Sequence, residues 1–193
     1  MKKKVKKLSI DKKKLYTLEV KKDHFATLCR SVINQQLSNK AAASILKKFK
    51  MLWPKKKFPT PQDVLKATPA KLRTAGISAQ KAGYLKDLAR KFLDGTINPK
   101  KFPRMSDDEI IAHLTAVKGV GVWTAHMFLI FALGRPDVLP VGDLAIRRGF
   151  QKAYGLRTEP SETLMRELAA PHKGEHSYLA LHLWSIMDAA KKK

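Results

Sequence analysis

One carboxylate in this sequence is placed where it could stabilise positive charge. Asp143 follows Leu139-Pro140-Val141-Gly142 and precedes a helical pattern that contains Arg147 and Arg148. The ordinary role of such a residue is an N-cap worth ~1 kcal/mol. A helix start also orients a carboxylate and keeps it ionised, as stabilising a developing cation requires. Both roles are compatible with the pattern, and taken alone the N-cap is the simpler interpretation.

A second candidate is the sequence Lys118-Gly119-Val120-Gly121, which joins two apolar-periodic segments. Two glycines allow the backbone to turn with positive φ and leave amide N–H groups exposed at the start of the following helix. Such amides, with the helix dipole, bind phosphate. A lone Gly-x-Gly is weak evidence, and an ordinary helical corner is the alternative. Lys118 within the hairpin strengthens the interpretation as a phosphate site.

The elements that position these groups are predicted to be helices. Ser, Thr or Asp precedes each apolar-periodic segment and Gly follows many of them, which is typical of helix starts and ends. The signals predict about nine or ten helices. Expected N-caps are Asp23, Ser38, Thr60, Thr68, Ser78, Ser106, Asp143 and Ser161, and a nearly uniformly apolar helix is expected from Val122 to Leu133. Sustained period-two alternation does not occur, so the predicted fold class is all-α.

The composition points to a polyanionic partner. The 193 residues carry 39 Lys and Arg against 16 Asp and Glu, a net charge of +23, of which positions 23–190 keep +12. Residues 1–22 read as a basic, flexible arm and residues 191–193 as a basic tail, flanking a folded domain over 23–190. The single cysteine, Cys29, cannot form an internal disulfide, hold a Cys-ligated zinc or supply the thiolates of an iron–sulfur cluster. The longest apolar run, Met127 to Leu133, is far short of the ~20 residues of a membrane helix, so no membrane partner is expected.

Three passages together resemble the helix-hairpin-helix DNA glycosylases, and within them the 3-methyladenine (alkylbase) glycosylases. They are His24 to Ala43, Val117 to Ala125 with Leu139 to Gly149, and Ser177 to Trp184; Gly76 to Tyr84 looks like the family's middle segment. The resemblance covers roughly residues 23–190. It implies two helical lobes with a cleft between them, double-stranded DNA containing damaged bases as partner, a monomer, and no cofactor. It also implies a cytoplasmic enzyme, nucleoid-associated in a bacterium or nuclear in a eukaryote.

The resemblance assigns roles residue by residue. Asp143 matches the catalytic aspartate, as base or as electrostatic stabiliser. Relatives that cut the DNA backbone carry a lysine nucleophile where this chain has Trp123, so simple hydrolysis of the N-glycosidic bond is implied. Trp123 and Trp184 match aromatic positions of the base pocket; Met127, where some relatives have tyrosine, and His126 lie one turn from Trp123. Core packing is the alternative for both tryptophans and for His126.

The same comparison implies a wedge that fills the gap left by a flipped nucleotide, carried by Gln36 and Leu37 before Ser38. Leu37 folded into the core is the alternative. DNA contacts are implied for Lys118, Gly119, Gly121, Thr124 and Arg147; no metal is expected, although the sequence leaves open a monovalent cation at the hairpin. Two other functions remain open: a non-catalytic helix-hairpin-helix DNA-binding module, and a glycosylase for other damaged bases. The preferred lesion cannot be read from the sequence.

Overall fold

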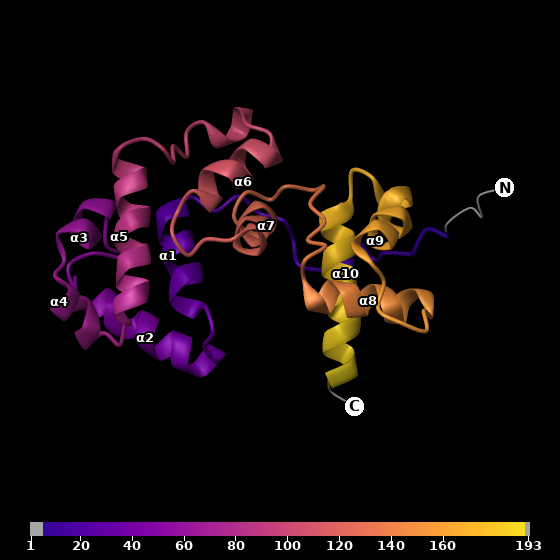
Figure 1. Ribbon diagram of the computed structural model, residues 1–193, viewed down its shortest axis with the longest axis horizontal. Helices are drawn as coiled ribbons and strands as arrows, with labels where there is room; N and C mark the ends of the chain where they lie inside the picture. Colours follow the sequence, from indigo (N-terminus) through magenta and orange to yellow (C-terminus); the bar gives the residue numbers. More distant parts are fainter. Residues whose placement is uncertain (1–5, 192–193) are drawn as a thin grey trace. The chain divides into compact units, whose positions relative to one another are not determined.

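The computed structural model describes residues 6–191, and within that range the chain is entirely helical (Figure 1). The predicted all-α class is therefore confirmed. Ten α-helices occur there: α1 His24–Asn34, α2 Asn39–Met51, α3 Pro61–Lys66, α4 Pro69–Thr74, α5 Ala79–Leu93, α6 Asp107–Thr115, α7 Val122–Phe131, α8 Leu144–Tyr154, α9 Glu162–Ala169 and α10 His176–Lys191. Short 3₁₀ turns lie at Lys12–Lys14, Phe102–Arg104 and Ala170–His172. None of the described helices is long and apolar enough to cross a membrane.

The chain divides into two compact units. One, here called unit 1, contains the residues up to Val20 and those from Leu129 onward; the other, unit 2, is Lys21–Phe128. Asp143 and Trp184 belong to unit 1, whereas the glycine hairpin, Trp123 and Gln36 belong to unit 2.

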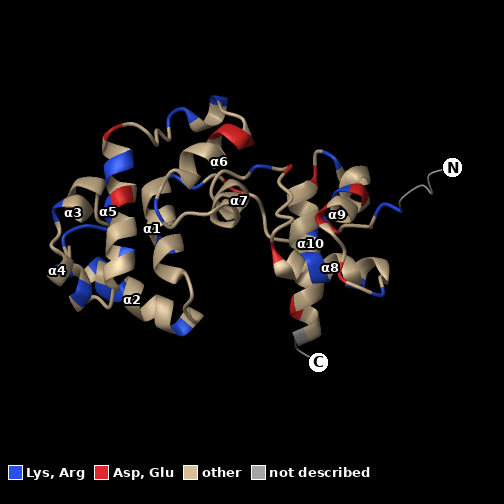
Figure 2. Cartoon of the chain, in the orientation of Figure 1, with Lys and Arg blue, Asp and Glu red and all other residues tan. Residues whose placement is uncertain are grey.

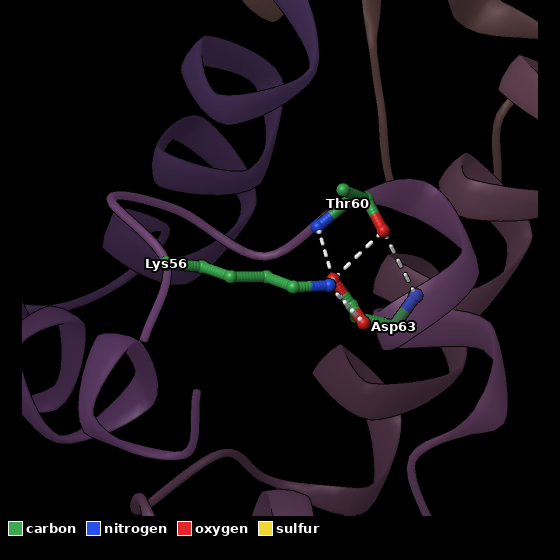
Figure 3. A network of polar contacts seen from close by, with 3 residues as sticks. All are labelled: Lys56, Thr60 and Asp63. Atoms are coloured by element: carbon green, nitrogen blue, oxygen red, sulfur yellow. Dashed lines mark hydrogen bonds and ion pairs between the residues drawn. The ribbon is translucent and has the colours of Figure 1, made fainter. Parts of the chain in front are cut away.

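The predicted helix starts are confirmed by their caps. In each of the eight, the side-chain oxygen of the N-cap residue accepts a hydrogen bond from the backbone N–H three positions on. At α3 the cap is extended into a small network (Figure 3): Asp63 accepts from the backbone and hydroxyl of Thr60 and from Lys56 Nζ at 2.6 Å. The Lys56 ammonium, together with the Thr60 donors, holds the pKa of Asp63 at about 2.

α7 is shorter than predicted, since it ends at Phe131 and not at Leu133. Gly134 is left-handed (φ +63°), and the N–H of Arg135 reaches back to the carbonyl of Leu129 at 3.0 Å. This closing bond tightens the last turn before the glycine.

Unit 1 is built on the packing of α8 against α10. Ile146 and Phe150 of α8 meet Leu179 and Leu183 of α10 in a fully buried cluster. The helices approach closely at Gly149, where an added Cβ would lie 2.8 Å from Leu183 Cβ. The α8 backbone, and with it Asp143 at its start, is therefore held firmly in place.

The N-terminal segment contacts unit 1 within the range 1–22 that is predicted as a flexible arm. Leu8 and Ile10 pack against the unit 1 core. The Leu8 N–H also donates to His172 Nε2 at 3.1 Å, and Lys12 pairs with Glu175 at 3.0 Å. Leu8 and Ile10 are surrounded in the sequence by lysines, so the segment does not show an apolar pattern. Residues 1–5 and 192–193, and with them the ends of both predicted basic segments, lie outside the described residues.

Unit 2 is organised around α5, against which α1, α3 and α4 pack. Leu85, Leu88 and Ala89 of α5 are fully buried, as are Leu28 and Val32 of α1. The first turn of α5 lies beside the turn that follows α1, the predicted wedge, because Lys81 Nζ donates to the carbonyl oxygens of Ile33 and Gln35.

Candidate nucleic-acid interface and carboxylate site

The hairpin between α6 and α7 is fixed from both sides by buried residues. Val117 and Val120 are buried, whereas Lys118 and Gly119 between them are exposed. Gly119 has φ +80°, and a Cβ there would overlap the ring of Tyr84. Only glycine fits this position, because both the backbone conformation and the aromatic contact exclude a side chain.

Gly121 differs from the prediction that both glycines have positive φ. Among the described glycines with positive φ, Gly119 is included and Gly121 is not, and a Cβ at Gly121 would meet no atom within 4 Å. Its small size is therefore not required for the fold. What glycine provides here is an uncovered backbone at the start of α7, the end of a helix that attracts anions.

Lys118 is anchored through its backbone and leaves its side chain at the surface. Its N–H donates to Asp87 Oδ2 at 2.9 Å, and the buried Asp87 also pairs with Arg90 at 3.3 Å. The residue is exposed, and the phosphate contact expected of its ammonium stays a prediction.

The turn between α1 and α2 presents its side chains to solvent. Leu37 is 37% exposed, so it is not folded into the core, and Gln36 is exposed as well. Gln36 has φ +54°, the one positive φ of a non-glycine residue in the described range. Ser38 caps α2 by accepting from the Ala41 N–H at 3.3 Å. The predicted wedge therefore consists of an exposed leucine preceded by a glutamine whose backbone conformation L-residues seldom adopt.

A cavity of about 500 Å³ opens in unit 2 between this turn and the hairpin. Trp123 and Met127 line it, and the indole of Trp123 is 51% exposed, which argues against simple core packing. Thr124 also lines it but is buried, while His126 is half-buried and lies outside the lining. Sequence reasoning did not single out six further lining residues: Ser31, Asn34, Gln35, Gln80, Lys81 and Tyr84. The segment Gly76 to Tyr84, noted only for its resemblance, contained three of them.

Asp143 forms the centre of a separate site in unit 1. It is buried (9% exposed) and its Oδ1 accepts from the Ile146 N–H at 2.8 Å and from Trp184 Nε1 at 3.2 Å. Trp184 stacks on Phe131, with ring centroids 5.8 Å apart. These donors and the start of α8 stabilise the negative charge of the carboxylate and fix its orientation.

Two neighbours of Asp143 on α8 complete this site. Leu144 is 52% exposed, whereas Asp143 before it is buried. The Nε of Arg147 is buried and has no hydrogen-bond partner within residues 6–191. Arg147 is therefore half-buried near the start of α8, one turn after Asp143, with its Nε enclosed by protein.

The charge of the described chain is distributed unevenly. Figure 2 shows Lys and Arg along α2 and α5 and in the loops of unit 2, and acidic residues at the start of α6. The latter are Asp107, Asp108 and Glu109, which complement the dipole at that helix start. The basic residues form the kind of surface that binds a phosphate backbone.

A basic, all-helical chain with a glycine hairpin and a buried, oriented carboxylate has the features of a protein that acts on DNA. Residues 29–172 match the HhH-GPD superfamily of base excision DNA repair proteins, and the chain belongs to this family. Over 174 residues it is 37% identical to DNA-3-methyladenine glycosylase 1 of Schizosaccharomyces pombe, covering 88% of this chain and 75% of that protein.

Two solved structures show the same fold. One is the S. pombe 3-methyladenine DNA glycosylase in complex with abasic DNA, with a TM-score of 0.76 and 34% identity over 88% of this chain and 82% of that one. The other is the DNA-3-methyladenine glycosidase of Bacillus halodurans, with a TM-score of 0.84 and 30% identity over 92% of this chain and 82% of that one. The family predicted from the motifs is confirmed.

Proposed function

We propose that this protein is a monofunctional DNA glycosylase that flips alkylated purines out of duplex DNA and hydrolyses their N-glycosidic bond, the first step of base excision repair. The observation that carries the proposal is the carboxylate of Asp143, buried at the start of α8 and bound by two N–H donors. A non-catalytic DNA-binding module has no need for an oriented carboxylate among its DNA-facing residues. The family membership and the glycosylase names of the relatives support this assignment.

Hydrolysis of this N-glycosidic bond requires mainly a fixed negative charge and a water molecule. An alkylated purine is a good leaving group because it carries positive charge, and bond cleavage leaves a sugar with oxocarbenium character. Asp143 would stabilise that cation electrostatically and orient or deprotonate the attacking water. Since Trp184 and α8 already hold the carboxylate in place, little reorganisation is needed during the reaction.

Aromatic rings would select the substrate. A methylated purine is cationic or electron-poor, so it is attracted to the face of an electron-rich indole more strongly than a normal base is. Trp184 lies beside the carboxylate in unit 1, and the exposed Trp123 lines the cavity of unit 2 with Met127. We assign base recognition to these three residues; His126, outside the cavity lining, has the weaker claim.

The absence of a lyase step rests on the first turn of α7. Lysine-bearing relatives form a Schiff base at the position occupied here by Trp123, and an indole cannot do so. Lys118 lies in the hairpin before α7, where its exposed ammonium suits a phosphate. The product would therefore be an abasic site and a free base.

Binding to DNA would combine a phosphate-gripping hairpin with the wedge. Gly119, Gly121 and Lys118 would bind the backbone, together with Arg147 and the N-terminal amides of α7 near Thr124. Gln36 and Leu37 would occupy the space vacated by the flipped nucleotide, with Ser38 behind them. We expect the protein to act as a monomer on genomic DNA, in a nucleoid or a nucleus.

The experiment that tests the function is direct. Duplex DNA treated with a methylating agent is incubated with the purified chain, and the released bases are separated by chromatography. We expect free 3-methyladenine and 7-methylguanine from the wild-type protein. Tight binding without base release would instead identify a DNA-binding module, and release only of oxidised or mismatched bases would identify a different glycosylase.

A further inference from the structure

The turn carrying Gln36 and Leu37 is held by two side chains, Lys81 and Gln35, for which the sequence predicts no role. Lys81, in the first turns of α5, donates from its Nζ to the carbonyl oxygens of Ile33 and Gln35, each at 2.7 Å. Gln35 Nε2 in turn donates to the carbonyl oxygen of Gly119 at 2.8 Å. These bonds connect segments 46 to 84 positions apart in the sequence.

The Lys81 contacts satisfy a definite structural need. The last carbonyls of a helix have no partner within the helix, and they lie at the negative end of its dipole. α1 ends at Asn34, so the Ile33 and Gln35 carbonyls are of this kind, and an ammonium is the best available donor. Burial lowers the pKa of Lys81, as expected for an ammonium enclosed by backbone and not fully hydrated.

The conformation that these bonds hold is one the turn would not keep by itself. Gln36 is left-handed, and such a residue persists only where its surroundings determine it. Its neighbour Leu37 is exposed and cannot fix the turn by packing. The backbone on the N-terminal side is fixed instead, by Lys81 at two carbonyls and by the Gln35 side chain at the hairpin.

The same helix also positions the hairpin. Tyr84, one turn after Lys81, lies against Gly119, and Gln80 Nε2 donates to the Tyr84 hydroxyl at 2.8 Å. On α5, Lys81 therefore contacts the turn, and Tyr84, bonded to Gln80, contacts the hairpin. The Gln35 bond joins the turn and the hairpin directly.

We infer that Lys81 and Gln35 are positioning residues for nucleotide flipping: they hold Gln36 and Leu37 in the conformation that enters the duplex, in register with the phosphate-binding hairpin. The inference rests on the proposed function for the role of the turn. Neither residue need touch the reacting atoms. Their effect is on the step that opens the duplex, and not on phosphate affinity or bond cleavage.

The test measures gap filling by binding alone. Two duplexes are compared that differ only at one central nucleotide, which is intact in one and a tetrahydrofuran abasic analogue in the other. The abasic duplex leaves a gap for the wedge, so the ratio of the two dissociation constants reports on the turn. Lys81→Met removes the donors and keeps the stem, and Lys86→Met on the same helix is the control, since it removes one charge without a hydrogen bond in this network.

We expect Lys81→Met to lower the preference for the abasic duplex by roughly fivefold or more, because filling the gap offsets an unstacking cost of a few kcal/mol. Leu37→Ala should lower it in the same way, Lys81→Arg should restore most of it, and Lys86→Met should leave it unchanged. Gln35→Met, which removes only the hairpin bond, should give an intermediate loss. Thermal unfolding establishes that each variant is folded. If Lys81→Met does not fold, the abasic preference of Gln35→Met tests the inference instead.

Three results would overturn the inference. The first is a Lys81→Met protein that keeps its preference while Leu37→Ala loses it. The second is an equal loss of affinity for both duplexes, which would reduce Lys81 to one charge among many. The third is a wild-type protein with no preference. Base release from methylated DNA tests the proposed function separately. If the wild-type protein releases no base, the glycosylase assignment is refuted. The positioning role would still hold if Lys81→Met loses the preference for the abasic duplex.

Discussion

Trp184 and the backbone of Ile146 donate to the same oxygen of Asp143, at 3.2 Å and 2.8 Å. The carboxylate is thus held from two directions, by its own helix and by α10. Because α8 and α10 pack at Gly149 with little room, the spacing between Trp184 and Asp143 is set by the core of unit 1. We therefore predict different losses of excision for a variant that removes the charge and for one that removes only the bond orienting it.

Replacing Asp143 with Asn should abolish most excision while DNA binding is retained. The amide oxygen can still cap α8, so the fold should remain, but the negative charge that stabilises the oxocarbenium-like sugar is lost. We expect base release to fall by on the order of 10²-fold or more. Single-turnover excision and binding to undamaged duplex are the measurements. Near wild-type turnover would show that Asp143 is only an N-cap.

Trp184→Phe should have a smaller effect on the same step. The ring can still stack on Phe131, but the hydrogen bond to Asp143 Oδ1 is lost, and a hydrogen bond to a charged group is worth about 1.5–3 kcal/mol. We expect the rate of single-turnover excision to fall by about tenfold or somewhat more, because the bond holds the carboxylate that stabilises the transition state. Trp53→Phe is the matched control, because Trp53 belongs to unit 2 and packs on Phe49. Equal rates for the two variants would remove Trp184 from the carboxylate site.

The wild-type protein should leave abasic sites without breaking the strand. Borohydride reduces the Schiff base that a lysine nucleophile forms with the sugar, so it traps a covalent complex only where such an amine acts. With Trp123 at that position we expect no trapped complex, and strand breaks only after alkali or heat. Efficient trapping would mean that another lysine reaches the sugar, and Lys118 would be the first to replace.

The N-terminal segment should loosen as the pH falls below neutral. His172 is fully buried and accepts from the Leu8 N–H, so its Nε2 must be unprotonated. Burial, and then the nearby charge of Lys7, lowers the pKa of His172 below its usual ~6.5. His172 therefore takes up a proton more readily when the N-terminal segment is detached than when Leu8 is bonded to it. The stabilisation is complete above about pH 6.5 and is lost as the pH drops through the lower pKa of the packed form.

The measurement is the amide resonance of Leu8 between pH 7.5 and 5. The other titratable neighbours of His172 are Glu175, His176 and His182. His172→Gln can still accept from the Leu8 N–H and does not titrate, so it should remove the pH dependence, whereas the exposed His113→Gln should not. A Leu8 amide that shifts with pH in the His172→Gln variant would assign the effect to those neighbours.

Local sequence signals predicted the helix starts well, because Ser, Thr and Asp caps act through bonds to N–H groups three positions away. They placed Asp143 correctly as a cap of α8. They do not indicate the packing of Leu8 and Ile10, because these side chains contact a core assembled from the other end of the chain. Lys81 could not be found this way either, since its partners lie 46 and 48 positions earlier and no pattern of charges marks a lysine that binds backbone carbonyls.

The two hairpin glycines should respond differently to substitution. Gly119→Ala places a methyl group on the Tyr84 ring at a positive φ, so it should destabilise unit 2 and lower the melting temperature. Gly121→Ala meets no atom within 4 Å and should fold normally. If the amides at the start of α7 bind phosphate, Gly121→Ala should still weaken binding to every sequence alike, because the methyl group keeps the backbone from close approach.

Salt titration separates this effect from a general loss of charge. The logarithm of affinity should fall with the logarithm of salt concentration by about 0.9 for each phosphate neutralised. Gly121→Ala should lower that slope by about one phosphate contact, and the abasic preference should stay as in the wild type. Lys118→Met should lower the slope as well. If the slope of the double variant is no lower than that of either single variant, both residues contact the same phosphate. An unchanged affinity in Gly121→Ala would mean that the hairpin does not bind the DNA backbone through these amides.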